Sequence, residues 1–431
     1  MTPYSERQRW GNLTLLSMSG YGFGIIGLVM AMDMVILPVL VISVAPEAWK
    51  NTYLALLGFS GLMIASLVQP LVGRASDQTQ SPQGRRIPYM LWGSVFVGVG
   101  LVGLGFAPNY LTLFAVWLFI QANINIGYGP YQALIRDLVP LSRIGAASAI
   151  KILSDVAGAV ILTTISSALV GRAAGSATDG WMWLSLGVIA ITLGSSTVIT
   201  SLTVRVKESA ASFAGGAAGL VRDQAPGLHP QLSRFVLSRS LFMAAITAYP
   251  TFGLFFLKDA VGLTRPAQAL GPMILVVGGA LFLSIYPAGW VSDRIGRKPV
   301  VMAGALGAAA SSIWLLWAND VTGLLVIASF LGVSTGILLS SNWALANEIG
   351  TSGREALHMG IVSLATTGGA AAAKAMGPGI DLLNRHSDGS GYQALMITCA
   401  SLFVLGALLL MPLKVEPSST LSSAHSPEEA R

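Results

Sequence analysis

The stretch GWVSDRIGRK at Gly289–Lys298 decides the fold, because a stretch about half the chain away repeats its pattern. The earlier copy reads GRASD at Gly73–Asp77 and, after a short insertion at 79–83, continues as GRR at Gly84–Arg86. Each copy lies where an apolar segment ends. A basic Gly–Asp loop that recurs in two halves of an apolar chain predicts a duplicated membrane transporter.

The composition excludes an ordinary soluble domain. Hydrophobic residues make up 53% of the chain and charged residues only 10%, and the mean hydropathy is +0.69. Soluble domains carry about 25% charged residues, most of them on the surface. This chain has too few charged residues to cover the surface of a soluble protein of its length. The 49 glycines suit helices that pack closely in lipid. The chain therefore reads as an integral membrane protein.

Apolar segments long enough to cross about 30 Å of hydrocarbon recur along the chain, and they lack the alternation of a membrane barrel. We place twelve of them at 13–44, 49–73, 88–107, 110–136, 145–171, 181–203, 232–257, 266–292, 299–318, 320–349, 355–384 and 389–412. The expected fold is an all-α membrane protein of two pseudo-symmetric six-helix bundles. The expected divisions are a first bundle at 1–203, a cytoplasmic linker at 204–231, a second bundle at 232–416 and a disordered cytoplasmic tail at 417–431.

Basic residues predict the orientation, since loops on the cytoplasmic side carry an excess of Lys and Arg. With the N-terminus inside, only five of the 25 basic residues fall outside, namely Lys50, Arg172, Lys258, Arg265 and Arg385. Both termini are therefore expected in the cytoplasm, and no cleavable signal peptide is visible. Topology and anionic lipid account for the sequence pI near 9.5, so the expected partner is a lipid bilayer and not a nucleic acid.

The two loops resemble the signature of the major facilitator superfamily, Gly-x-x-x-Asp-Arg-x-Gly-Arg-Lys. The second loop matches every fixed position, whereas the first has Gln78 where an Arg usually stands. The inserted first copy with GRRIPY at 84–89, and GPYQALIRDLVP at 129–140, resemble the glycoside–pentoside–hexuronide cation symporters and related sucrose carriers. This resemblance implies the twelve-helix major facilitator fold and transport by alternating access.

The repeated loops are candidate gates, because ion pairs at helix ends would hold one conformation and break when the two halves rock. We expect Gly73 and Gly289 to permit close helix approach, and Asp77 and Asp293 to cap or brace neighbouring helix ends. Asp137 is the expected partner of Arg85 or Arg86. The alternative is simple positive-inside anchoring. The candidate gating residues are Gly73, Asp77, Arg85, Arg86, Asp137, Gly289, Asp293, Arg294, Arg297 and Lys298.

Ionisable residues inside apolar segments are functional candidates, since a charge in hydrocarbon is costly. Asp33, Asp155 and Lys374 are the candidate cation-coupling residues. Lys151 lies one helical turn before Asp155, a spacing that puts both on one face and predicts a neutralised pair. The alternative for Asp155 and Lys151 is a structural pair near the cytoplasmic interface. The alternative to a cavity-lining role for Asp33 and Lys374 is a static pair or an interfacial location. Arg239 lies about one turn into its segment, where its side chain could snorkel to the interface.

Amides and aromatic rings in two segments form a candidate substrate site. Gln121, Asn125, Tyr128 and Gln132 share a face at helical spacing, and Asn342 and Trp343 lie in the tenth segment. Such groups suit hydroxylated ligands through hydrogen bonds and ring stacking. Hydrogen bonding between helices is the open alternative.

Catalytic and metal motifs are missing from the sequence. The lone Cys399 and the four dispersed His residues give no metal spacing, and there is no nucleophile elbow or phosphate loop. We therefore expect no enzymatic activity, no catalytic residue, no bound metal and no cofactor other than a coupling cation. That cation is expected to be a proton, with Na⁺ as the alternative.

The sequence thus predicts a monomeric secondary transporter of a small organic solute in a bacterial cytoplasmic membrane, with both termini inside. A sugar or glycoside moved by proton symport is the leading prediction, on the resemblance to that group. A drug or metabolite exporter of the same fold is one alternative. A membrane assembly or pigment-handling protein is the other.

Overall fold

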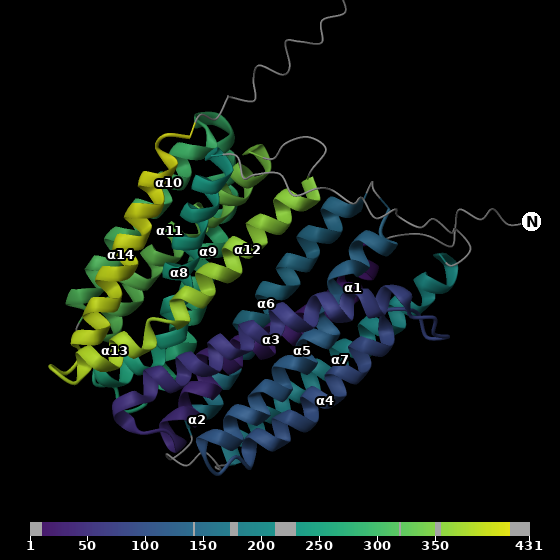
Figure 1. Cartoon of the computed structure of the whole chain (residues 1–431), viewed down its shortest axis with the longest axis horizontal. Helices are drawn as coiled ribbons and strands as arrows, with labels where there is room; N and C mark the ends of the chain where they lie inside the picture. The colour runs from purple at the N-terminus through teal and green to yellow at the C-terminus, as the bar shows by residue number, and fades with distance from the viewer. Residues whose placement is uncertain are drawn as a thin grey trace, which may run out of the picture. The chain divides into compact units, whose positions relative to one another are not determined.

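The computed structural model describes residues 11–140, 143–172, 180–211, 230–318, 320–349 and 355–413. Within these ranges the chain is almost entirely helical and contains no strand. Eleven of the described helices are long and apolar enough to cross a membrane (Figure 1). The chain is therefore a multi-pass, all-helical membrane protein, in agreement with its composition.

The helical elements follow the expected segments closely along the chain. They are α1 (Asn12–Ala31), η2 (Met32–Ile36), α2 (Leu37–Val44), η3 (Glu47–Trp49), α3 (Lys50–Gln78), α4 (Ile87–Gly105), α5 (Tyr110–Leu138), α6 (Ile144–Val170), α7 (Gly180–Ala211), α8 (Pro230–Asp259), α9 (Pro266–Ile295), α10 (Arg297–Trp314), η5 (Leu315–Trp317), α11 (Val321–Ile349), α12 (Glu355–Lys374), α13 (Gly377–Asn384) and α14 (Ser390–Leu410).

Two of the expected segments are interrupted. The first contains one turn of π-helix, η2, in which the N–H of Leu37 bonds the carbonyl of Met32. Pro38 follows in the first turn of α2 and has no N–H to continue a regular ladder. The segment expected at 355–384 is broken between Lys374 and Gly377, which separates α12 from α13. Hydropathy reveals neither break.

The chain forms two compact units. The first comprises Met1–Asp223, Pro250–Leu275 and Gly377–Gly389, and the second comprises Gln224–Tyr249, Val276–Met376 and Ser390–Arg431. The first unit therefore includes the last part of α8, the start of α9 and all of α13, besides the helices of the first half. The break between α12 and α13 falls at a boundary between the units.

Within the first unit, α1 packs along α6 and α7, and α5 packs between α3 and α4 (Figure 1). The α1–α6 crossing is close because both helices carry glycine there. A Cβ at Gly27 would lie 2.6 Å from the carbonyl oxygen of Gly158, and one at Gly158 would lie 2.0 Å from that of Phe23. In the second unit α10 packs against α11 and α14.

The expected linker at 204–231 overlaps helix at its start. α7 continues to Ala211, beyond the expected end at 203, because 204–211 contains good helix formers and no Gly or Pro. The remaining linker residues 212–229 and the expected tail 417–431 lie outside the described residues. The division into two bundles at the linker stays a prediction.

Candidate functional site

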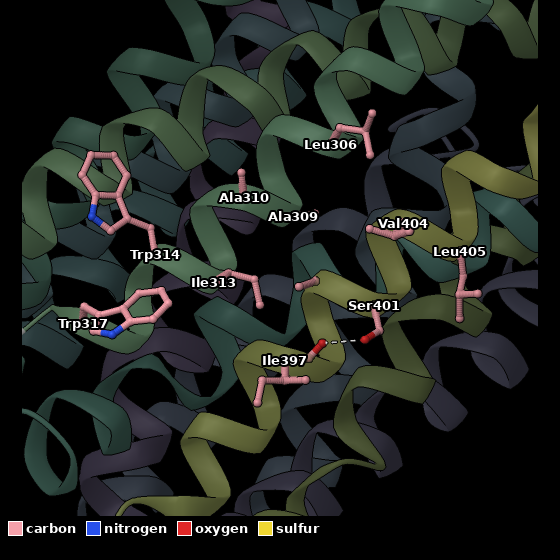
Figure 2. A pocket seen from close by; sticks show the side chains of 11 residues that line it. Leu306, Ala309, Ala310, Ile313, Trp314, Trp317, Ile397, Ser401, Val404 and Leu405 are labelled. Carbon is pink, nitrogen blue, oxygen red and sulfur yellow. Dashed lines mark hydrogen bonds between the residues drawn. The ribbon is translucent and has the colours of Figure 1, made fainter.

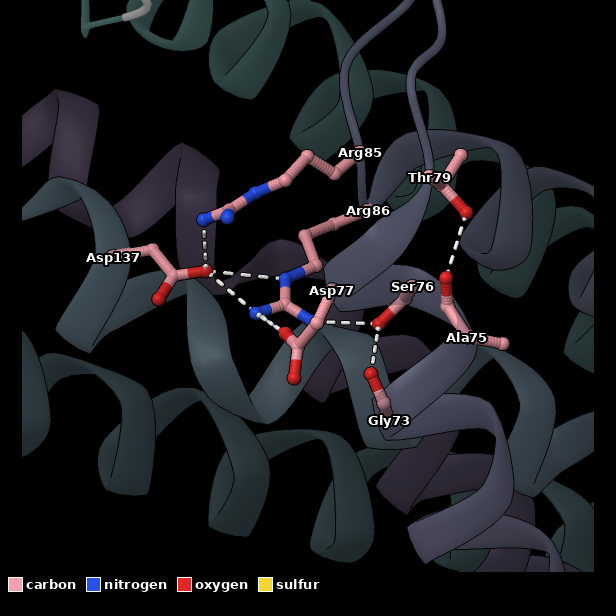
Figure 3. Close-up of polar contacts among 8 residues, drawn as sticks. All are labelled: Gly73, Ala75, Ser76, Asp77, Thr79, Arg85, Arg86 and Asp137. Atoms are coloured by element: carbon pink, nitrogen blue, oxygen red, sulfur yellow. Dashed lines mark hydrogen bonds and ion pairs between the residues drawn. The ribbon is translucent and has the colours of Figure 1, made fainter. Parts of the chain in front are cut away.

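The first repeated loop holds a buried arginine among carboxylates (Figure 3). Arg86 is only 4% exposed, and its Nη2 lies 2.6 Å from Asp77 Oδ1 and 2.8 Å from Asp137 Oδ2. Its Nε donates to Asp137 Oδ2 at 3.1 Å, and its Nη1 donates to Ser76 Oγ at 2.6 Å. Arg85 reaches the same Asp137 oxygen at 3.1 Å. Asp137, expected to pair with Arg85 or Arg86, pairs with both. Together with Asp77 and Ser76, these contacts join the ends of α3 and α5 to the start of α4.

The second loop uses different partners. Arg297 Nε lies 3.6 Å from Glu348 Oε2, and its Nη1 donates to the carbonyl of Ala344 at 2.5 Å. Lys298 Nζ donates to the main-chain carbonyls of Met411 and Leu413 at 2.5 and 3.0 Å. Backbone carbonyls thus take much of the role that carboxylates have in the first loop.

Two further charges of the second loop face outward. The guanidinium of Arg294 stacks 3.6 Å from the centre of the Trp290 ring. Asp293 is exposed and forms no ion pair with any residue that the structure describes. The bracing contact expected of Asp293 is therefore not made in this conformation, whereas that of Asp77 is.

The expectation that Gly73 and Gly289 permit close helix approach is not met in this structure. A Cβ on Gly73 would meet no described atom within 4 Å, and one on Gly289 would lie 3.8 Å from Ser340 Oγ, an ordinary contact. The signature glycine that the fold does require is Gly296, whose φ of 95° lies in the left-handed region. Gly84 occupies the same place in the first loop with φ 103°.

A third polar cluster lies within the first unit between α1, α5 and α6. Lys151 Nζ donates to Asp155 Oδ2 at 2.7 Å, as the spacing predicts, and both side chains are largely buried. The same ammonium lies 5.8 Å from the ring centre of Tyr128 and 5.4 Å from that of Tyr131. A Cβ on Gly22 would lie 2.0 Å from Asp155 Oδ1, so glycine is what admits the carboxylate beside α1.

The second oxygen of the Asp155 carboxylate, Oδ1, is buried and has no hydrogen-bond partner among the described residues. Buried polar atoms are nearly always paired, so each exception calls for an explanation. A proton or a ligand donor at Oδ1 would satisfy the group.

The predicted amide face of α5 lies next to this cluster. Asn125 is buried, accepts a hydrogen bond from Gln69 Nε2 at 2.7 Å and donates to the carbonyl of Gln121 at 2.7 Å. Tyr128 is half-buried, whereas Gln132 is exposed. Gln121, Asn125 and Tyr128 therefore form one strip along α5. Gln69 of α3 was missed because it stands alone in an apolar run.

Asp33 and Lys374 belong to different compact units. Asp33 is half-buried in the π-helical turn η2 of the first unit. Such turns occur often at functional sites, since they change which way a side chain points. Lys374 is buried in the second unit as the last residue of α12. The negative end of the helix dipole stabilises a cation at this position. Their coupling roles stay predictions.

Arg239 does not snorkel, and this corrects the expectation from the sequence. It is 2% exposed, because α8 begins at Pro230, more than two helical turns earlier. Its Nη1 bonds Asn342 Oδ1, its Nε donates to Thr366 Oγ1 at 3.0 Å, and its Cζ lies 4.6 Å from the centre of the Trp343 ring. The two predicted substrate residues of α11 thus both contact this arginine.

A cavity of about 870 Å³ in the second unit differs from the polar clusters described above, because its lining is apolar (Figure 2). It lies between α10, η5 and α14 and is almost wholly apolar, with Trp314 and Trp317 at one end and Ser401 as its polar residue. Ser401 already donates to the carbonyl of Ile397. The cavity offers no group for a polar solute and does not coincide with any predicted site. Among the described residues no group of His, Cys, Asp and Glu forms a metal site.

Comparison with solved structures agrees with this architecture. A bacterial homologue of the iron transporter ferroportin superposes with a TM-score of 0.69 at 14% identity, over 94% of this chain and 99% of that one. A bacterial homologue of the human lysosomal transporter Spinster gives a TM-score of 0.67 at 13% identity, over 93% and 95%. At these identities the likeness concerns the fold alone.

Sequence relatives are more informative. The sucrose transport protein SUC4 of Arabidopsis thaliana is 32% identical over 110 residues, which span 22% of this chain and 21% of that protein. The MFS-type transporter YfnC of Bacillus subtilis is 24% identical over 382 residues, 84% of each chain. The pattern of the family described as MFS/sugar transport protein matches residues 18–377. The chain therefore belongs to the MFS/sugar transport family of the major facilitator superfamily.

Proposed function

We propose that the protein is a proton-coupled symporter that carries a small organic solute, a sugar or glycoside, across the bacterial cytoplasmic membrane by alternating access. Both termini are proposed to lie in the cytoplasm. The observation that carries the proposal is the half-buried Asp155–Lys151 pair, which lies against Tyr128 and Tyr131 next to the amides of α5.

The cluster combines the groups that sugar symport needs. Amides such as Gln121 and Asn125 exchange hydrogen bonds with hydroxyl groups, and a tyrosine ring offers a face for a sugar ring. Asp155 Oδ1 lacks a partner while Oδ2 holds Lys151, so a proton at Oδ1 would satisfy the carboxyl group and weaken its hold on the lysine. Proton uptake would then alter the position of Lys151 over the tyrosine rings beside the solute.

A second network supports alternating access. In the first unit Asp381 of α13 accepts hydrogen bonds from Asn51 Nδ2 at 2.8 Å, Thr52 N at 2.7 Å and Thr52 Oγ1 at 2.6 Å. Beside it, buried Lys50 pairs with Asp259 at 2.7 Å. These contacts join the start of α3 to segments from the second half of the chain. Under the proposed topology they lie on the outer side and would break when that side opens.

Transport in proteoliposomes tests the proposal. The purified protein is reconstituted, and uptake of labelled sugars and glycosides is measured with an imposed inward proton gradient, an inward Na⁺ gradient or none. We expect accumulation with the proton gradient. Asp155→Asn should abolish accumulation yet keep solute exchange, which needs no net proton movement. Asp320→Asn, at an exposed acid outside the cluster, is the matched control and should behave as wild type.

Three outcomes would change the assignment. If Asp155→Asn still accumulates solute against its gradient while Asp33→Asn does not, the proton carrier is Asp33. If only the Na⁺ gradient drives uptake, the coupling ion is sodium. If no sugar or glycoside is taken up or exchanged by protein that remains folded, the proposed substrate class is wrong. Reporter fusions near residues 215 and 425 test the topology.

A further inference from the structure

Arg239 is a buried cation whose described partners are all neutral. They are the amide of Asn342, the hydroxyl of Thr366 and the ring of Trp343. Thr366 donates its own hydrogen to the carbonyl of Val362, so it is oriented to accept from the guanidinium. No carboxylate of the described residues lies within salt-bridge distance of Arg239. In the first unit, by contrast, buried Lys50 and Arg86 each hold two carboxylates.

A charge in this position needs a counter-charge. Removing an ion from water costs several kcal/mol even after relaxation, and neutral partners return only part of that cost. Charged side chains are rarely buried unless they are paired. None of the described residues that contact Arg239 is acidic, which leaves the counter-charge to come from outside the chain.

Unused hydrogen-bond donors converge at the same place. A guanidinium carries five N–H groups, of which the described contacts use only those of Nε and Nη1. The amide nitrogen of Asn342 is buried and has no hydrogen-bond partner in the described structure. Several donors without acceptors, next to a positive charge, match an oxyanion. Trp343 is 42% exposed, so the cluster borders accessible surface on one side.

We propose that Arg239 and Asn342, with Thr366 orienting the guanidinium, form an oxyanion-binding subsite, which holds a carboxylate or phosphate group of the transported solute. The planar guanidinium binds two oxygens of such a group side by side, and the Asn342 amide donates to the same group. Trp343 keeps the guanidinium plane in place by stacking. The substrate class is then an acidic organic solute, such as a sugar acid or sugar phosphate, and not a neutral sugar.

The inference rests on the proposed function only in taking the ligand to be the transported solute. Binding is therefore measured without any ion gradient, so that failure of proton coupling does not affect the result. Thermal unfolding of the purified full chain is followed in neutral detergent with increasing inorganic phosphate, with gluconate and with sorbitol. Sorbitol differs from gluconate only in carrying CH₂OH where gluconate carries carboxylate.

We expect phosphate or gluconate, but not sorbitol, to raise the unfolding midpoint of the wild type. Arg239→Gln should raise the half-saturating oxyanion concentration at least about tenfold, as expected for loss of a charge-assisted contact. Asn342→Asp places a carboxylate beside Arg239 at unchanged size. It should raise the midpoint without ligand and remove the response to oxyanions. The conservative Arg239→Lys should restore part of the oxyanion response.

A second set of measurements, in lipid nanodiscs, distinguishes a soluble oxyanion from the phosphate of a lipid headgroup. The same variants are melted in nanodiscs of phosphatidylglycerol and in nanodiscs of phosphatidylcholine. A difference between wild type and Arg239→Gln that depends on phosphatidylglycerol, with no response to soluble oxyanions, would assign the subsite to a lipid headgroup. A wild type that responds to no oxyanion in either setting would overturn the proposal. So would an Arg239→Gln variant that responds as strongly as the wild type.

Discussion

The two repeated loops share a sequence pattern but not a set of contacts. In the first, Arg86 is buried between Asp77 and Asp137, which ties three helices together through charged groups. In the second, Arg297 and Lys298 bond backbone carbonyls, and the Glu348 carboxylate is 3.6 Å away. Both loops turn at a glycine with positive φ. The motif therefore specifies a turn and a supply of cations, and the surrounding helices decide what the cations bind.

The largest expected difference concerns the acidic partners of the two loops. Asp137→Asn removes a carboxylate from buried Arg86 and should lower the free energy of unfolding by about 3 kcal/mol, as for other broken buried pairs. Glu348→Gln should cost about 1 kcal/mol or less, because Arg297 keeps its carbonyl and is more exposed. Unfolding midpoints in detergent measure both. Equal shifts of the unfolding midpoint would show that the acidic partners stabilise the two loops equally.

The shared turn should respond alike in both loops. Gly296→Ala forces an L side chain to φ 95°, ψ 150°, a region almost reserved for glycine, and should destabilise by about 2 kcal/mol. Gly84→Ala should cost a similar amount. Gly73→Ala is the control inside helix α3, where a methyl group meets no described atom and alanine favours helix by up to about 1 kcal/mol. A destabilised Gly73→Ala would contradict the open space seen there.

The smallest expected effect on stability is at the two loop aspartates. Asp77→Asn breaks a half-exposed pair with Arg86 and should cost about 1 kcal/mol or less, whereas Asp293→Asn should leave the unfolding midpoint unchanged. If the loops act as gates, both variants should nevertheless slow transport turnover more than they weaken solute binding. Wild-type turnover in both, at normal expression, would reduce the loops to membrane anchors.

The residue types and spacing along single helices were sufficient for several features. The i,i+4 spacing of Lys151 and Asp155 predicted their pair, and the polar residues of α5 were found at helical spacing. Asp137 was expected to pair with Arg85 or Arg86, and it pairs with both. Arg239 was misjudged, since its depth depends on where α8 begins. Lys50 was assigned to the outer side and Asp381 was not singled out, because nothing local shows that distant segments enclose them.

By itself, the sequence determined the class of protein, the position of most of the apolar helices, the repeated loops and the family. Hydropathy and helical periodicity are local properties, so a single chain displays them without any knowledge of packing. Only the tertiary structure decided which cations are buried and what they bind. That choice depends on contacts between helices far apart in the chain, such as α8 with α11 and α12 around Arg239. The free-energy cost of burying a charge depends on the groups that surround it in space and not on its neighbours in sequence.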